Sequence, residues 1–168
     1  MNSMPIIQEI LSDRRRFMSL LLLADEQESM VERYLECGRM FVMYSFEGEP
    51  IASAIVTEES DCVCELKSLA VASSFQRQGF GRRMMDFLCS LYSNRFDVMT
   101  VGTGDSFSTV SFYENCGFHY SHVVPDFFRL NYDHPIWEEG KLLKDMVYLK
   151  KQLYIYLYIN IYFNVPIV

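Results

Sequence analysis

The hydrophobic residues change their spacing within the segment Leu69–Leu88, which reads LAVASSFQRQGFGRRMMDFL. Apolar residues before Ser73 favour a strand, whereas those after Gly81 recur at the spacing of one helix face: Met84, Phe87, Leu88 and Leu91. Between the two patterns, Gly79 and Gly81 allow the chain to turn tightly. A strand that passes through a glycine turn into a helix predicts a mixed α/β fold.

The flanking residues predict one sheet with helices around it. Strands are predicted over Met4–Ile10, Met40–Phe46, Pro50–Thr57, Val63–Val71, Phe96–Gly102, Phe118–Val124 and Lys141–Leu149. Further helices are predicted over Arg14–Ala24, Glu26–Glu36 and Ser106–Asn115. No repeat and no Gly/Ser/Pro-rich linker interrupts this succession, so residues 1–152 are expected to form a single domain.

The charge and the cysteine content of the chain indicate which binding partners and which cellular location to expect. The chain has 15 Lys and Arg against 22 Asp and Glu, a net charge of −7, which argues against a nucleic-acid partner. Its 5 cysteines are odd in number and contain no CxxC motif, and the start MNSMPIIQEI lacks a signal-peptide pattern. We therefore expect buried free thiols and a cytoplasmic location.

The end of the chain, residues 153–168, alternates aliphatic residues with tyrosine and asparagine, which is the period of a strand. This stretch is shorter than the ~20 apolar residues of a spanning helix, and Pro166 interrupts it, so no membrane segment is expected. Such a strand would cover a sheet edge, pair with a second protomer in a homodimer, or remain an appendage. The sequence leaves these three roles open.

Arg77, Arg82 and Arg83 flank the start of the helix that follows the glycine turn. Basic residues at a helix N-terminus oppose the helix dipole, so a bound polyanion such as a pyrophosphate would explain them, and a solvated basic face is the alternative. A dinucleotide-binding fingerprint does not fit, because Met84 occupies its third glycine position. A Walker loop does not fit either, since the chain has no Gly-Lys-Ser/Thr sequence.

The motif Gln76-x-x-Gly79-x-Gly81 resembles the acetyl-coenzyme-A signature of the GNAT superfamily of N-acetyltransferases. Three further segments also resemble this family, and in particular its small bacterial acetyltransferases: Leu20–Asp25, Val101–Phe118 and Asn131–Gly140. The resemblance implies a GNAT fold, in which a central, mostly antiparallel sheet is flanked by helices. It also implies transfer of acetyl from acetyl-CoA to a primary amine of a small molecule or peptide, by direct attack in a ternary complex. A non-catalytic acyl-CoA-binding or protein-interaction module with the same fold is the alternative.

The resemblance carries cofactor-binding roles onto one strand and the loop after it. Backbone groups of Leu69, Ala70 and Val71 would contact the pantetheine arm. The expected pyrophosphate loop consists of Arg77, Gln78, Gly79, Phe80, Gly81 and Arg82, and the signature residue Gln76 before it is also expected to bind the cofactor. Asp105 stands where relatives often have asparagine, so it would either contact the cofactor or cap the helix that begins at Ser106.

Two residues are predicted to be catalytic. Tyr113 aligns with the tyrosine that many members of the family aim at the coenzyme sulfur, where a phenol can donate a proton to the leaving thiolate. Glu65 is a lone acid in an apolar strand interior and is our candidate for the base that takes the amine proton. An ordinary pair between Glu65 and Lys67 is the alternative, since both lie on one face of the strand by alternation.

The C-terminal part of the domain contains an acidic and aromatic stretch and three histidines. The stretch comprises Asp126, Phe127, Tyr132, Asp133, His134, Trp137 and Glu138. It would form a rim for a cationic amine or else a plain surface loop. His119, His122 and His134 do not have metal-ligand spacing, so no metal site is expected.

Overall fold

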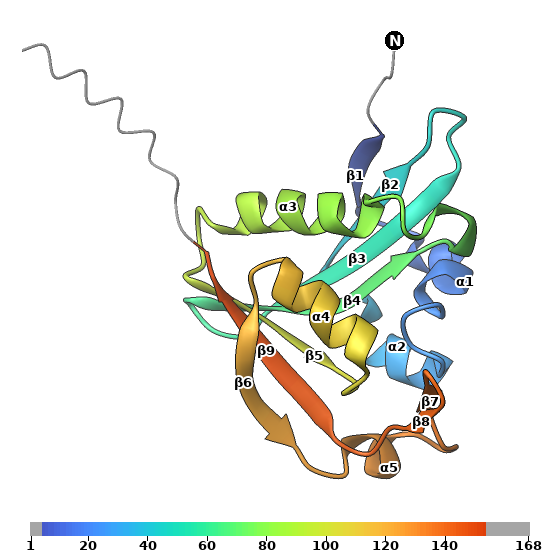
Figure 1. Ribbon diagram of the computed structural model, residues 1–168. Coiled ribbons are helices and arrows are strands. Elements are labelled where there is room, and N and C mark those ends of the chain that lie inside the picture. Colours follow the sequence, from blue (N-terminus) through green and yellow to red (C-terminus); the bar gives the residue numbers. More distant parts are fainter. Residues whose placement is uncertain (1–4, 154–168) are drawn as a thin grey trace, which may run out of the picture.

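The computed structural model describes residues 5–153 and contains one large mixed sheet (Figure 1). Its strands are β1 (Ile6–Ile10), β2 (Arg39–Tyr44), β3 (Pro50–Glu58), β4 (Val63–Val71), β5 (Val98–Thr103), β6 (His119–Val124) and β9 (Met146–Gln152). They lie in the order β1-β2-β3-β4-β5-β9-β6, and only β4 and β5 pair in parallel. The predicted mostly antiparallel sheet with flanking helices is therefore confirmed.

Helices cover both faces of the sheet (Figure 1). The described residues form the 3-10 helices η1 (Arg14–Phe17) and η2 (Ser73–Phe75), and the α-helices α1 (Met18–Leu21), α2 (Glu28–Leu35), α3 (Phe80–Tyr92), α4 (Phe107–Asn115) and α5 (Phe127–Asn131). The larger hydrophobic core lies between the sheet and α3 and α4, and a second core lies between β1–β3 and α1 and α2.

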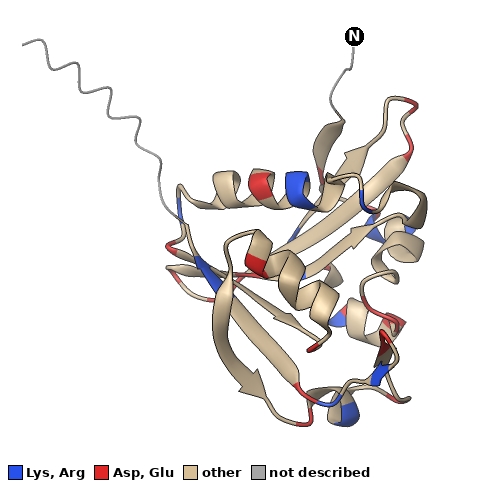
Figure 2. Cartoon of the chain, in the orientation of Figure 1, with Lys and Arg blue, Asp and Glu red and all other residues tan. Residues whose placement is uncertain are grey.

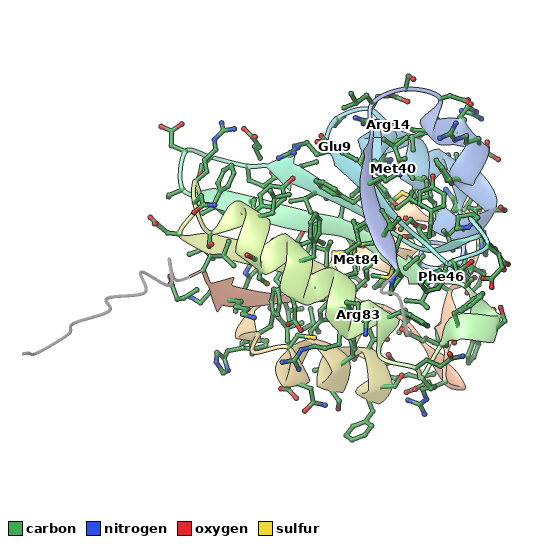
Figure 3. The ribbon with its side chains drawn as sticks, turned by 90° about the horizontal axis from the view of Figure 1, so that it is seen from above. Glu9, Arg14, Met40, Phe46, Arg83 and Met84 are labelled. Carbon is green, nitrogen blue, oxygen red and sulfur yellow. The ribbon has the colours of Figure 1, made fainter. Side chains whose placement is uncertain are left out.

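The hydrophobic stripe of α3 holds this helix on the larger core. Met84, Met85 and Leu88 are fully buried, and Met84 packs against the sheet while its neighbour Arg83 is exposed (Figure 3). Burying each such side chain contributes about 1.5–3 kcal/mol, so the start of α3 is fixed relative to β4.

Several predicted elements differ in the structure. The predicted helix Arg14–Ala24 is divided into η1 and α1, because the chain tightens to 3-10 geometry before α1 begins. The predicted strand Lys141–Leu149 is two strands in different sheets: β8 (Lys141–Leu142) pairs with β7 (Trp137–Glu138), and β9 begins only at Met146. Helix α5 was not predicted. A small apolar cluster of Phe128, Ile136 and Leu143 organises this segment, and its members are too far apart in sequence to show a period.

The cysteines are all free, as predicted, but they are not all buried. Cys64 and Cys116 are buried, whereas Cys37 and Cys62 are exposed because they lie in turns outside the strands. Within residues 5–153, no helix has the length and hydrophobicity needed to cross a bilayer. The predicted tail strand lies, from Tyr154 onward, outside the described residues, and its role in a homodimer stays a prediction.

Candidate active site

Strands β4 and β5 separate halfway along their length. Their parallel pairing ends where Leu66 lies opposite Val101, so the second half of β4 has no partner strand on that side among residues 5–153. On its other side, β4 pairs with β3 through a register shift: Val56 lies opposite Leu66 and Ile55 opposite Ser68, which leaves Lys67 as a bulge. A bulge bends a strand and increases its twist, which accounts for the opening between β4 and β5.

The open half of β4 presents free backbone groups to this gap. In an antiparallel pair, successive residues point their backbone N–H and C=O groups alternately toward the partner strand and away from it. The N–H of Ala72 donates to the carbonyl of Ile51 at 2.9 Å, so every second residue from Ala72 points toward β3. Ala70 consequently pairs with Ser53 of β3, while the N–H and C=O groups of Leu69 and Val71 point away from β3. Of the three predicted backbone contacts, Leu69 and Val71 face the gap and Ala70 does not.

The loop after β4 is braced by its glutamines. Gln76 Nε2 donates to the Val71 carbonyl at 3.0 Å, and Gln78 Nε2 donates to the Ser74 carbonyl at 2.9 Å. Arg77 and Gly79 both adopt left-handed conformations, with φ of 60° and 85°. Gly81 allows a close approach to α4, since a Cβ there would lie 3.3 Å from the Phe112 ring and the ring would have to shift slightly. The loop therefore turns sharply and brings the first turn of α3 beside α4.

The start of α3 is suited to binding an anion. The three arginines beside it differ in the contacts that their guanidinium groups already make within the protein. Gly79 is the N-cap and no side chain of the described residues caps the helix, so the first N–H groups are available to a ligand. Arg82 is held by the Asp86 carboxylate at 3.1 Å and by the Asn115 carbonyl at 2.6 Å. Arg83 lies over the Phe80 ring, 5.9 Å from its centre. Arg77 makes no ion pair within residues 5–153, which leaves its guanidinium available.

Asp105 does not cap α4, contrary to one of the two roles predicted for it. Ser106 is the N-cap residue, and no side chain within residues 5–153 caps the helix; the Asp105 carboxylate pairs with Lys141 instead. Its other oxygen, Oδ1, is buried and has no hydrogen-bond partner among the described residues. Contact between Asp105 and a cofactor remains a prediction.

A cavity of about 330 Å³ opens at the gap between β4 and β5. Its wall comes from β4, the end of β5, α4, the segment between α1 and α2, and the segment from α5 to β9. Leu69 and Tyr113 both border it, so the free backbone groups and the predicted catalytic phenol share one space. The volume falls in the range of sites for small molecules.

Tyr113 is held in the core beside this cavity. Its side chain is only 7% exposed and packs between the rings of Phe112 and Phe118, whose centres lie 5.1 and 5.7 Å from its own. Burial raises the pKa of Tyr113 well above its ordinary value. The phenol therefore stays protonated at neutral pH, which is the form that can donate a hydrogen bond.

The second predicted catalytic residue, Glu65, lies beside the cavity wall but does not form part of it. Its Oε1 accepts from the Tyr148 hydroxyl at 3.1 Å and lies 2.9 Å from Lys67 Nζ, the pairing we gave as the alternative. Burial and the Glu65 charge raise the pKa of Tyr148 to about 12. Lys67 does border the cavity and also lies 3.7 Å from Glu59.

The acidic and aromatic stretch contributes only some of its members to the cavity. Tyr132, Trp137 and Glu138 border it, and Glu138 Oε1 accepts from the Thr109 hydroxyl at 2.6 Å. Asp126 instead pairs with Arg129 and Lys144, and Asp133 pairs with His134. Figure 2 shows acidic residues close together where the segment before α2 meets β7. No cluster of metal-ligating side chains occurs in the part of the chain that the structure describes.

Asp25 is a cavity residue to which the sequence assigned no role. Its Oδ1 accepts from the Tyr132 hydroxyl at 3.0 Å, and its Oδ2 accepts from the Tyr34 hydroxyl at 3.3 Å. Burial raises the pKa of Asp25. The only sequence signal was an acid at the end of the apolar run Leu20–Ala24, and its partner Tyr132 lies 107 positions away.

Comparisons with known proteins agree with this fold and site. Residues 36–120 match the model of the acetyltransferase (GNAT) domain. The uncharacterized N-acetyltransferase YvbK of Bacillus subtilis (strain 168) is 33% identical over 133 residues, which covers 77% of this chain and 84% of the relative. The chain therefore belongs to the GNAT acetyltransferase family, as the motifs predicted.

Solved structures give the same result. A GNAT family acetyltransferase from Elizabethkingia anophelis, with acetyl-CoA bound, is 28% identical and superposes with a TM-score of 0.83 over 89% of this chain and 98% of its own. A Bacillus subtilis acetyltransferase in complex with CoA is 30% identical, with a TM-score of 0.80 over 89% of this chain and 99% of its own.

Proposed function

We propose that this protein is an N-acetyltransferase that transfers the acetyl group of acetyl-CoA to a primary amine by direct attack in a ternary complex. The observation that carries the proposal is the gap between β4 and β5. There, Leu69, which has free backbone groups, and Tyr113 border one cavity, and Val71 follows on the same open edge of β4. The two relatives solved with acetyl-CoA or CoA, at 28% and 30% identity, support the choice of donor.

The pyrophosphate and the pantetheine arm of acetyl-CoA would bind to different parts of the site. The N–H groups at the start of α3, with Arg77, would bind the pyrophosphate, because backbone donors and a guanidinium complement an anion together. Leu69 and Val71 would pair with the pantetheine arm in place of a neighbouring strand. The carbonyl of Val71 already accepts from Gln76, so the groups left for this pairing are both backbone groups of Leu69 and the N–H of Val71.

The chemical step requires stabilisation of an oxyanion, a proton donor and a proton acceptor. A backbone N–H of Leu69 or Val71 would stabilise the oxyanion that forms when the amine attacks the thioester. Tyr113 would donate a hydrogen bond to the thiolate that leaves. Glu65 is proposed as the final proton acceptor through a water relay, since the side chain itself stands behind the cavity wall.

The test is thermal unfolding with acetyl-CoA, followed by a thiol-release assay with a panel of primary amines. Acetyl-CoA at 100 times its Kd would raise the unfolding temperature by roughly 5–10 °C. Amine-dependent thiol release would establish transfer. Stabilisation without release from any amine would instead favour a non-catalytic acyl-CoA-binding module, and absence of stabilisation would contradict both functions.

A further inference from the structure

We propose that Asp25 binds a second cationic group of the acceptor, so that the preferred substrate is an amine carrying an additional ammonium or guanidinium group. This inference rests on the proposed function and concerns the acceptor end of the same cavity. Asp25 lies in the segment between α1 and α2 and borders the cavity that Tyr113 also borders.

Within the described part of the chain, only neutral groups donate hydrogen bonds to the carboxylate of Asp25. Its side chain accepts from the hydroxyls of Tyr34 and Tyr132 and from the N–H of Gln27, at 3.0 to 3.4 Å. No Lys, Arg or His nitrogen of residues 5–153 lies within 4.0 Å of it, in contrast to Glu65 with Lys67 and Glu26 with His134. The guanidinium of Arg33 acts on Asp25 only from beyond 4.0 Å and donates to Asn131 instead. A half-buried carboxylate without a counter-charge in contact is unfavourable, and a cation in the cavity would relieve that penalty.

The acetylated nitrogen itself is a poor partner for this carboxylate. An amine attacks a thioester only when it has lost its extra proton, and a fixed carboxylate beside it would hold the protonated form. A group that stays positively charged throughout the reaction avoids this conflict. The charge of Asp25 therefore favours an acceptor with two cationic centres, one of which reacts while the other stays bound.

The surrounding wall fits a cationic chain. Trp137 and Tyr132 border the cavity, and aromatic faces attract ammonium groups and the carbons next to them. Glu26 and Glu138 add negative charge to the same wall, whereas Lys67, the single basic residue among the described wall residues, is engaged by Glu65 and Glu59. Contacts between residues 25–27 and 132–134 hold the two segments together, so Asp25 is rigidly placed.

The experiment compares diaminobutane with butylamine as acceptors for the wild type, Asp25→Asn and Glu28→Gln. Glu28→Gln is the matched control, because it removes the same charge from an exposed position paired with Arg15. We expect the wild type to prefer the diamine in kcat/KM by roughly tenfold or more, the contribution of one charge-assisted contact. In Asp25→Asn the preference should fall to about one through a higher KM for the diamine, and in Glu28→Gln it should persist.

Two further readouts keep the inference separate from the proposed function. The temperature shift with acetyl-CoA should be the same in all three proteins, which shows that Asp25→Asn is folded and binds the donor. Tyr132→Phe, which removes one hydroxyl from the carboxylate, should raise the KM for the diamine less than Asp25→Asn does.

A wild type that prefers butylamine or treats both acceptors alike overturns the inference and leaves the transferase intact. A diamine preference that survives in Asp25→Asn does the same. Absence of thiol release by the wild type with these or any other amines contradicts the proposed function, and this inference with it.

Discussion

Gln76 Nε2 donates a hydrogen bond to the backbone carbonyl of Val71, 3.0 Å away, so the first residue of the loop signature braces the last residue of β4. The side chain thereby fixes the angle at which the chain leaves the strand. It also occupies the carbonyl that would otherwise be free at the gap. This residue is thus expected to act on donor binding by positioning the loop.

Replacing Gln76 by alanine should weaken donor binding without changing the chemistry. One partly exposed hydrogen bond contributes about 1 kcal/mol, so the KM for acetyl-CoA should rise by about fivefold while kcat stays the same. Gln8→Ala, an exposed glutamine of β1, is the control and should leave both constants unchanged. A fall in kcat at saturating acetyl-CoA would show that Gln76 acts in the reaction rather than on the loop.

Tyr113→Phe should lower turnover far more than it weakens acetyl-CoA binding. The ring packs between Phe112 and Phe118, and phenylalanine preserves that packing while removing the hydroxyl. We expect kcat to fall by about 100-fold, the lower part of the range for general acids, and the Kd for acetyl-CoA to stay within twofold or so. Steady-state thiol release and equilibrium dialysis measure the two effects, with the exposed Tyr120→Phe as control. Equal losses in both would remove the catalytic role.

Glu65→Gln distinguishes a role of Glu65 as proton acceptor from a role only as the ion-pair partner of Lys67. If Glu65 accepts the proton through water, kcat should fall at least about tenfold and the fall should be partly reversed at high pH, where the amine is already neutral. Glu59→Gln is the matched control, because Glu59 also contacts Lys67 but lies further from it. Similar kinetics for the two variants at every pH would reduce Glu65 to a partner of Lys67.

The part of the site that was predictable from sequence is the part built from consecutive residues. The strand Val63–Val71 was predicted with the bounds it has in the structure, and the loop and α3 follow it directly. Alternation and helical spacing are local signals, and glycine marks the turn between them. The helix that carries Tyr113 was predicted from the same kind of local signal, whereas the role of Tyr113 came from the resemblance of Val101–Phe118 to the family.

The acceptor side of the cavity was not predictable, because it is assembled from segments distant in the sequence. Asp25 meets Tyr132 only through the fold, and the strand predicted over Lys141–Leu149 is divided because Leu143 packs on Phe128 and Ile136. No periodicity within either segment contains this information. The pairing of Glu65 was left open for a related reason, since alternation places Lys67 on its face but does not show which of the two borders the cavity.

Two carboxyl groups should give the stability of the protein opposite dependences on pH. Burial raises the pKa of Asp25 above its ordinary value of 3.8, so its contribution favours the folded state below that pH and is lost as pH rises through the raised pKa. The hydrogen bond from Arg39 lowers the pKa of Glu9 below 4.5, so its contribution is present above that pH and is lost as pH falls.

Unfolding temperatures of variants measured from pH 3 to 7 or so check these signs. Asp25→Asn, which mimics the protonated carboxyl, should gain stability relative to the wild type as pH rises from about 4. Glu9→Gln should be less stable than the wild type near neutral pH, and the difference should close as the solution becomes acidic. Parallel curves for Asp25→Asn and the wild type would mean that the carboxyl is not desolvated.

Comparing alanine variants of Gly79 and Gly48 distinguishes the conformational role of Gly79 from its role in binding acetyl-CoA. Both have positive φ, 85° and 81°, and a Cβ at either position would meet no atom within 4 Å. Alanine at each should therefore lower the free energy of unfolding by a similar amount, about 1 kcal/mol, because the left-handed conformation is strained by a Cβ.

The two glycines differ in their expected effect on binding. Gly48 lies in the turn between β2 and β3, whereas Gly79 is the N-cap of α3, whose first N–H groups are proposed to bind the pyrophosphate. Chemical denaturation should thus give equal losses for the two variants, while only Gly79→Ala should weaken acetyl-CoA binding in dialysis. If both variants bound acetyl-CoA as tightly as the wild type, the start of α3 would not be the anion site.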